Sequence, residues 1–293
     1  MASAANFVRQ LGNGLTLRGL RWQQDAPIKV LALHGWLDNA NSFAPMAAHL
    51  PADIDLLALD LCGHGQSEHR PPGQWYQLID FAYDAAAVAR GLGWRRYHLL
   101  GHSLGGATCC LIAAADPAAI ISLGLIEGLG PLPGKASASG VRLRQAWQGL
   151  QQSSTDKLRR HDSPAAAMRA RLQQNRMQER SAQLLIERSL QQVADGWQWR
   201  SDTRLRLASP VRFTETEILH LLQAIECPLL QILPDPPTAL MPAAMMQRRR
   251  AVIRDYREQR LPGYHHLHMD APAECADSLF SFFQQHDAKS DDP

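Results

Sequence analysis

The residues best suited to covalent chemistry lie at positions 101–105, where the sequence reads Gly-His-Ser-Leu-Gly. An apolar run, 97–100, precedes them and a helical stretch, 104–115, follows them. This context is typical of a nucleophile elbow, in which a serine stands on a tight strand-to-helix turn that only small neighbours permit. The first turn of the helix aims its amides at the site, so the amide of Leu104 can stabilise an oxyanion. We therefore predict Ser103 as a nucleophile.

Two further motifs support this interpretation. His34-Gly35-Trp36 ends the apolar run 30–33, and the amide of Trp36 would be the second oxyanion donor beside Leu104. We interpret His34 as structural and the Trp36 ring as a wall of the pocket. The stretch 60–67, Asp-Leu-Cys-Gly-His-Gly-Gln-Ser, has the composition of a turn, in which Asp60 and Ser67 bond local amides. His64 is favoured as a structural residue rather than a base.

A serine hydroxyl is a poor nucleophile at neutral pH and needs a general base. The chain has 12 histidines that compete for this role. The segment 262–272, Pro-Gly-Tyr-His-His-Leu-His-Met-Asp-Ala-Pro, follows the last predicted strand and precedes the last helix. Its loop is therefore expected at the carboxyl edge of the sheet, where active sites gather. We expect the base among His265 and His266, its first two histidines.

Short apolar runs alternate with helical stretches, as in a mostly parallel α/β sheet with helices on both faces. The predicted strands are 30–33, 54–59, 97–100, 121–126, 228–233 and 258–261, with 15–22 as an antiparallel edge strand. The predicted helices are 43–50, 76–92, 104–115, 245–256 and 273–285.

The alternation stops between residues 131 and 226, where Gln, Arg, Ala and Leu recur with helical spacing. We predict a helical insertion there. Residues 141–206 hold 13 Arg plus Lys against 6 Asp plus Glu. We interpret these charges as solvated helix faces, with attraction of anionic substrates as the alternative.

The bulk composition excludes several classes of protein. With 293 residues, 45% of them hydrophobic, the chain can bury a large core, and a net charge of +2 gives no strong field toward nucleic acid or an anionic membrane. The five cysteines show no metal-ligand spacing, which indicates a reducing compartment without disulfides. Residues 1–14 lack the features of a secretory signal, and no apolar stretch is long enough to span a bilayer. We expect a soluble cytoplasmic protein with a polar, frayed end at 287–293.

The order of the motifs HGW, DLCGHGQS, GHSLGG and GYHHLHMDAP resembles the α/β-hydrolase superfamily over residues 15–283. The stretches 31–43 and 196–214 are similar, more narrowly, to the serine hydrolase-like protein group. The resemblance implies an α/β-hydrolase core formed by 1–130 and 227–293, with 131–226 as a helical cap. In the superfamily the catalytic histidine commonly stands seven residues before a proline that opens the last helix. That register selects His265, with Pro272 as the proline.

The acid of a catalytic triad is where the chain departs from the commonest pattern. Many relatives place an aspartate shortly after the strand that corresponds to 228–233, whereas here the chain reads Pro-Asp-Pro-Pro at 234–237. Asp235 is one candidate. The superfamily also uses the position just after the preceding strand, and Glu127 occupies it. We favour Glu127 and keep Asp235 as the alternative.

A serine nucleophile performs acyl transfer. The resemblance therefore implies hydrolysis of a carboxylic ester or a related acyl bond in a small molecule, as in a carboxylesterase, with no metal or cofactor and no nucleic acid or membrane partner. A dehalogenase is disfavoured because those enzymes use a nucleophilic aspartate. The alternatives are a cofactor-free perhydrolase or haloperoxidase-like enzyme with the same triad, and a non-catalytic ligand-binding relative. The sequence leaves the substrate and the oligomeric state open.

Overall fold

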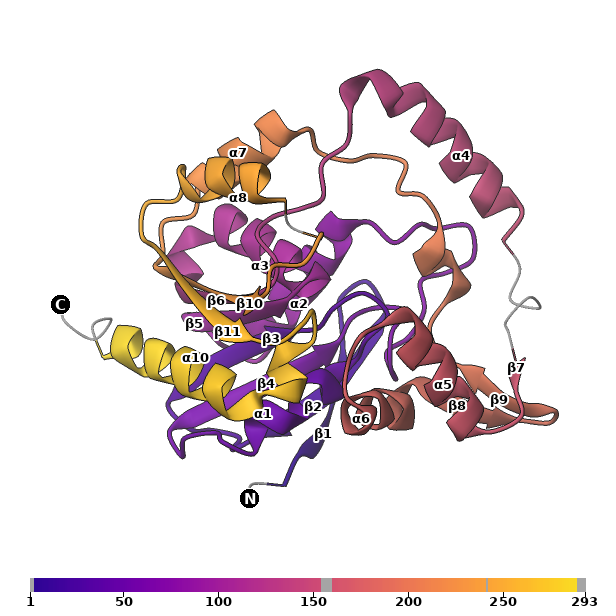
Figure 1. The fold of residues 1–293 in the computed structure, drawn as a ribbon, viewed down its shortest axis with the longest axis horizontal. Helices are drawn as coiled ribbons and strands as arrows, with labels where there is room; N and C mark the ends of the chain where they lie inside the picture. Colours follow the sequence, from indigo (N-terminus) through magenta and orange to yellow (C-terminus); the bar gives the residue numbers. More distant parts are fainter. Residues whose placement is uncertain (1–2, 154–159, 241, 289–293) are drawn as a thin grey trace.

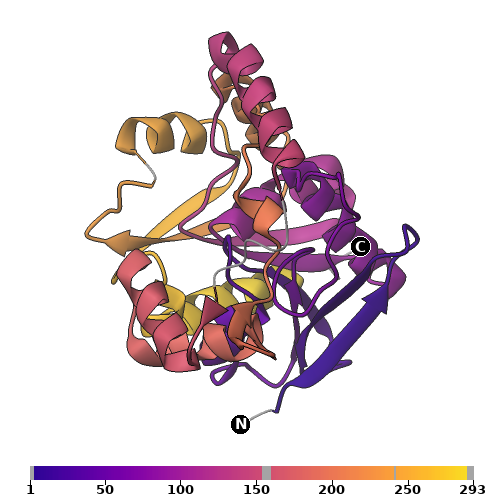
Figure 2. The same ribbon diagram turned by 90° about the vertical axis from the view of Figure 1, so that its right-hand side faces the viewer.

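The computed structural model describes residues 3–153, 160–240 and 242–288. An eight-stranded sheet crosses the molecule in the order β1-β2-β4-β3-β5-β6-β10-β11. All neighbouring strands from β4 to β11 run parallel, while β1 and β2 form an antiparallel ribbon at one edge (Figure 2). The strands are β1 Ala5–Gln10, β2 Thr16–Trp22, β3 Ile28–Leu33, β4 Ile54–Asp60, β5 Tyr97–His102, β6 Ile120–Ile126, β10 Leu229–Asp235 and β11 Tyr256–Pro262.

Helices cover both faces of the sheet (Figure 1). One face packs against α2 Leu78–Gly91, α3 Leu104–Ala115, α7 Glu215–Gln223 and α8 Ala243–Arg250. The other face packs against α1 Ala44–Ala47, α9 Leu267–Asp270 and α10 Pro272–Asp287. Burial on both faces explains why β4 and β6 are buried along their whole length, and it confirms the predicted mostly parallel α/β sheet.

Three predicted elements need correction. The strand predicted at 15–22 pairs with β4 on one side but is not the edge, because β1 pairs with its other side. β1 has no buried residue, so its sequence carries no strong apolar signal. The helix predicted over 245–256 ends at Arg250, and the helix predicted over 43–50 is only α1 preceded by the 3₁₀ turn η1, Ala40–Phe43.

The segment 131–226 is neither purely helical nor wholly separate from the core, because α7 lies within it and packs against the sheet through Ile218 and Leu222. Before α7 it contains the helices α4 Ser139–Gln151, α5 Pro164–Gln174 and α6 Glu179–Ser189, the 3₁₀ turns η3 Ala136–Ala138 and η5 Thr203–Arg206, and a small sheet of β7 Arg160–His161, β8 Leu190–Val193 and β9 Gly196–Trp199. Strands β8 and β9 pair antiparallel around a two-residue turn, with Val193 opposite Gly196. The alternating Trp-Gln-Trp of β9 carried this strand signal, which the helical spacing of the preceding residues obscured.

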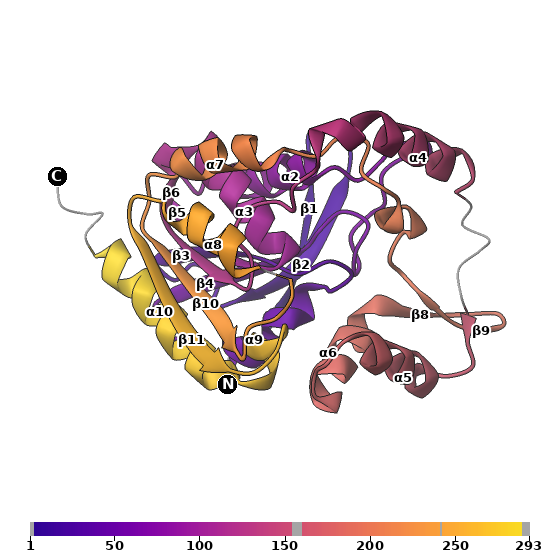
Figure 3. The ribbon, with the colours of Figure 1, turned by 45° about the horizontal axis from the view of Figure 1, so that its top comes forward.

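Polar contacts anchor part of this segment over the carboxyl ends of β3 and β4. Arg188 of α6 donates to Asp60 at 3.0 and 2.8 Å, and Asn39 donates to the Leu185 carbonyl at 2.7 Å. Helix α6 buries six residues, whereas α4 buries only Ala146. Helix α4 stands apart from the group formed by α5, α6, β8 and β9 (Figure 3). The segment thus combines a tightly docked part with a loosely packed helix.

All five cysteines are buried and unpaired. Among the described helices, none combines the length and the apolar character that a membrane crossing requires.

Candidate active site

Ser103 lies between the end of β5 and the first residue of α3, in the predicted strand-turn-helix context. Its backbone has φ 51° and ψ −110°, a conformation that side chains disfavour. Two glycines make the turn possible. A methyl group on Gly101 would lie 2.6 Å from the Gly106 Cα, and one on Gly105 would lie 1.8 Å from the Leu33 carbonyl oxygen. The helix thus begins directly against the sheet and presents Ser103 at its amino end.

Because of this close approach, we predict that Gly105→Ala destabilises the fold by more than about 3 kcal/mol, as a clash with backbone that cannot move aside. Urea unfolding measures the change. Gly140→Ala is the matched control: it also replaces a helical glycine, but no atom lies within 4 Å of the added methyl. The control is expected to change stability by about 1 kcal/mol or less. Equal stability of the two variants would contradict the tight packing of the elbow.

The two predicted oxyanion donors lie on neighbouring turns. Leu104 is the first residue of α3, so the positive end of the helix dipole lies at its amide. Trp36 lies in the turn closed by the Asp38 amide, which donates to the Gly35 carbonyl at 3.1 Å. In the part of the chain that the structure describes, neither the Trp36 nor the Leu104 amide donates to a protein acceptor. The Trp36 ring is half exposed, and its indole N–H donates to the Leu205 carbonyl at 3.0 Å.

His265 and Glu127 are in direct contact. The Glu127 carboxylate accepts from Nδ1 of His265 and from the Thr238 hydroxyl. Glu127 is buried and follows β6 directly, with φ 41°, whereas the His265 side chain is 30% exposed. Burial alone would raise the pKa of the Glu127 carboxyl, but the contacts with His265 and Thr238 outweigh it and hold that pKa below 4.5. An ionised carboxylate on Nδ1 fixes the tautomer whose Nε2 is free to accept a proton.

This lowered pKa has a consequence for stability. A carboxyl whose folded pKa is depressed stabilises the fold above its unfolded pKa, and loses this contribution as the pH falls through the folded pKa. We therefore expect the wild-type protein to lose stability relative to Glu127→Gln as the pH falls below about 4.5, the usual pKa of the group. Urea unfolding of both proteins from pH 7 to pH 3.5 measures the difference. A stability difference that is constant over this range would show that Glu127 titrates normally.

One backbone hydrogen bond and one ring contact bring the serine, the acid and the histidine loop close together. The Ser103 amide donates to the Ile126 carbonyl at 3.0 Å, one residue before Glu127. The ring of His102, next to Ser103, lies 4.7 Å from the ring of His265 between centroids. Among the described residues, no hydrogen bond joins Ser103 Oγ to His265. Such catalytic hydrogen bonds are often long without substrate and tighten in the complex.

Asp235, the alternative acid, lies at the end of β10 with its side chain exposed. Its carbonyl accepts from the Gly263 amide at 3.2 Å, but its carboxylate forms no hydrogen bond or ion pair with any described residue. The structure therefore brings Glu127, and not Asp235, into contact with His265.

The residues interpreted as structural have partners within the fold. His34 accepts from the Leu61 amide at 3.0 Å, and burial lowers its pKa to about 4. Burial also lowers the pKa of His64 to about 3. Asp60 accepts from the amides of Ala40 and Gln66, each at 2.8 Å, and so closes its turn. Neither histidine forms a hydrogen bond with Ser103.

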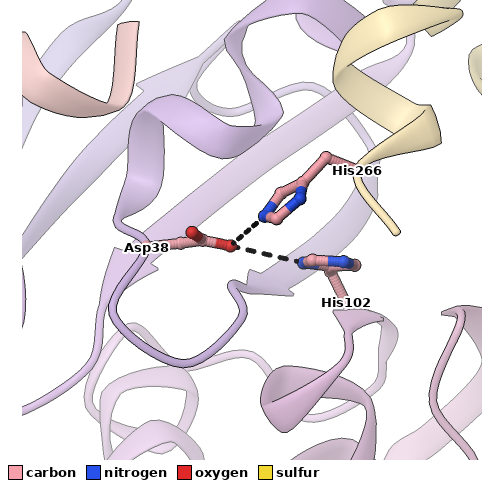
Figure 4. Close-up of side chains that lie close together, drawn as sticks. All are labelled: Asp38, His102 and His266. Atoms are coloured by element: carbon pink, nitrogen blue, oxygen red, sulfur yellow. Dashed lines mark hydrogen bonds and ion pairs between the residues drawn. The ribbon is translucent and has the colours of Figure 1, made fainter. Parts of the chain in front are cut away.

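The sequence analysis missed a buried group formed by Asp38, His102 and His266 (Figure 4). Asp38 Oδ2 lies 3.3 Å from His266 Nε2 and 3.5 Å from His102 Nδ1, and the three ligand-type atoms lie within 4.8 Å of one another. Arg171 of α5 pairs with the other carboxylate oxygen. Since this guanidinium already balances the charge of Asp38, the group fits an ion-paired network better than a site for a divalent cation. The only sequence signal was an aspartate four residues after His34.

The chain matches the family model described as alpha/beta hydrolase fold over residues 29–231, and it belongs to that family. It is 27% identical to a serine hydrolase-like protein of Danio rerio, over 92% of this chain and 85% of that protein. It is 35% identical to the hypothetical protein PA1622 of Pseudomonas aeruginosa PAO1, with a TM-score of 0.88 and coverage of 97% and 100% of the two chains. The thioesterase domain from the curacin biosynthetic pathway is 25% identical, with a TM-score of 0.82 and coverage of 96% and 99%.

These findings confirm the α/β-hydrolase fold that the order of the sequence motifs implied, and the resemblance to the serine hydrolase-like group. One of these similar proteins is named as a serine hydrolase-like protein and another as a thioesterase domain, so the comparisons support a hydrolase without naming its substrate.

Proposed function

We propose that this protein is a serine hydrolase that cleaves a carboxylic ester or a related acyl bond, thioesters included, through an acyl-enzyme. The observation that carries the proposal is the hydrogen bond of His265 with the buried Glu127, beside a serine held on a tight turn. A nucleophile, a base and a group that orients the base are the parts that acyl transfer requires. The contact of a buried carboxylate with the proposed base supports an enzyme over a non-catalytic ligand-binding relative.

In this mechanism, His265 Nε2 takes the proton of Ser103 as Oγ attacks the substrate carbonyl. The amides of Trp36 and Leu104 donate to the oxyanion of the tetrahedral intermediate. The leaving alcohol or thiol takes the proton from His265 and departs, and water then repeats the attack on the acyl-enzyme. Glu127 holds the imidazole in the required tautomer and stabilises its charged form.

We further propose that the part of 131–226 that precedes α7 acts as a cap that bounds the substrate site, whereas α7 itself packs against the core sheet. The contact between Trp36 and Leu205, next to an oxyanion donor, supports this role. The comparison with a thioesterase domain makes thioesters a natural second substrate class to test.

The direct experiment is a substrate screen with p-nitrophenyl esters of graded acyl length and matching acyl thioesters, measured beside labelling by a fluorophosphonate probe. An unactivated serine reacts slowly with such a probe, so stoichiometric labelling supports the proposal. Absence of both hydrolysis and labelling in folded protein would contradict it. Peroxide-dependent bromination in the same samples distinguishes the haloperoxidase-like alternative.

A further inference from the structure

The proposed mechanism makes no use of Asp38, although this carboxylate lies beside the histidine loop and the nucleophile elbow. Its side chain is 1% exposed. Burial alone would raise the pKa of Asp38, but His266 and Arg171 outweigh burial and hold that pKa well below its usual range. Asp38 is therefore an ionised carboxylate in the protein interior. Such a group is costly unless its partners are fixed, which indicates a defined role.

The first partner of Asp38 belongs to the histidine loop. His266 Nε2 donates to Asp38 Oδ2 at 3.3 Å, and His266 is the residue that follows His265 in the chain. The His266 side chain is only 3% exposed, so the bond is shielded from water. The carboxylate thus fixes the loop one peptide away from the proposed base.

A second contact holds the same loop from the other side. His102 Nε2 donates to the backbone carbonyl of His265 at 2.8 Å. Burial lowers the pKa of His102 to about 4, so the ring is neutral at pH 7 and its single proton lies on Nε2. Its Nδ1 edge packs against Asp38 and against Gly35, where a methyl group would lie only 2.8 Å from Nδ1. His265 is therefore held between two residues that both contact Asp38.

The third partner comes from the proposed cap. Arg171 of α5 pairs with Asp38 Oδ1 and also donates to the Leu37 carbonyl at 2.9 Å. Both ends of this ion pair are largely buried, at 10% and 1% exposure. The Asp38 amide meanwhile closes the turn that contains Trp36. One residue therefore contacts the cap, the oxyanion turn, the nucleophile elbow and the histidine loop.

We propose that Asp38 is a positioning residue that aligns His265 through His266 and His102, and that Arg171 couples the docking of the cap to this alignment. The inference rests on the proposed function, since it assigns His265 as the base. In Asp38→Asn, an amide N–H in place of Oδ2 faces the N–H of His266, and two donors repel. The loop then loses its anchor while the substrate-contacting surface is unchanged.

The expected result for Asp38→Asn is a fall in kcat of about 10- to 100-fold, the usual cost of losing a group that orients a functional ligand. KM for a p-nitrophenyl ester is expected to change by less than about threefold, because uniform binding is untouched. Arg171→Gln is also expected to lower kcat, as Asp38→Asn does. In the double variant the two effects are expected not to multiply, since Arg171 acts through Asp38.

Asp55→Asn is the matched control for loss of a buried ion-paired carboxylate. Asp55 is fully buried and bonds Arg21 at 2.8 and 2.6 Å, but it lies at the opposite end of β4 from Asp60 and the site. It is expected to lower the free energy of unfolding while kcat stays at the wild-type value. Folded Asp38→Asn protein with wild-type kcat would overturn the inference. If Asp38→Asn does not fold, Arg171→Gln carries the test, and wild-type kcat in that variant would overturn it.

A readout that does not depend on turnover separates this inference from the proposed function. The His265 Nδ1 proton, which is donated to the Glu127 carboxylate, is expected to give a low-field NMR signal in wild type and in Asp55→Asn. This signal is expected to broaden or disappear in Asp38→Asn. Its persistence there would overturn the positioning role, whether or not the wild-type protein hydrolyses esters. Absence of wild-type hydrolysis with a signal that does depend on Asp38 would contradict the proposed function alone.

Discussion

Replacing Ser103 by alanine is expected to lower kcat for ester hydrolysis by at least about 10⁴-fold, because acyl transfer then has no nucleophile. Fluorophosphonate labelling is expected to disappear with it. Stopped assays at high enzyme concentration measure the residual rate, and thermal unfolding checks that the variant is folded. The expected stability is close to that of the wild type, since Ser103 Oγ forms no hydrogen bond with a described residue.

Ser278→Ala is the control for this experiment. Ser278 lies on α10, and its hydroxyl donates only to the Glu274 carbonyl at 2.9 Å. Its replacement is expected to leave kcat and labelling at wild-type values. If Ser103→Ala retains labelling or turnover, another residue is the nucleophile and the mechanism proposed here is wrong.

Replacing Glu127 by glutamine is expected to lower kcat by about 10³- to 10⁴-fold, the size of effect found when the orienting acid of a triad becomes an amide. Glutamine lacks the charge that stabilises the protonated imidazole. Its N–H₂ group also favours the wrong tautomer of His265. Steady-state kinetics with a p-nitrophenyl ester measure the change, and the labelling rate of Ser103 should fall in parallel.

Asp235→Asn tests the alternative acid in the same assay as Glu127→Gln. Its carboxylate is exposed and has no partner among the described residues, so kcat is expected to stay within about threefold of the wild type, as for other surface changes. The reverse outcome, with Asp235→Asn inactive and Glu127→Gln active, would assign the acid to Asp235 and require a different conformation of its loop.

The central strands were predictable because burial on both faces leaves an unbroken apolar run in the sequence. Residues 54–59 and 121–126 agree with β4 and β6 to within one residue at either end. The edge of the sheet was less predictable. Strand β1 depends on pairing with β2 rather than on burial, and pairing of this kind leaves no periodic signal.

The small sheet in 131–226 was missed for a similar reason. Its strands are two to four residues long, too short for a clear period of two. Their residues also continue the helical spacing of α6. Hairpins of this size are defined by their turn and by tertiary packing, neither of which the surrounding composition indicates.

Within the site, the arrangement of residues that are close in the sequence was predicted, and contacts between residues that are far apart in the sequence were not. The surroundings of Ser103 come from contiguous residues, so one motif predicted the turn. Contacts between distant segments were not predictable, since Asp38 meets Arg171 across more than 130 residues. Thr238, which donates to Glu127, likewise had no sequence signal. Choosing between Glu127 and Asp235 depends on how two loops after different strands bend, which their sequences alone do not determine.

The uneven packing of 131–226 bears on how such a protein could diversify. Side chains of α4 contribute almost nothing to the interior, so a library randomised along that helix should yield mostly well-folded members. The same randomisation along α6 would remove the bond from Arg188 to Asp60 and the bond from Asn39 to the Ser189 hydroxyl, and would reduce expression. New selectivities are therefore expected to be recovered more readily from the first library than from the second.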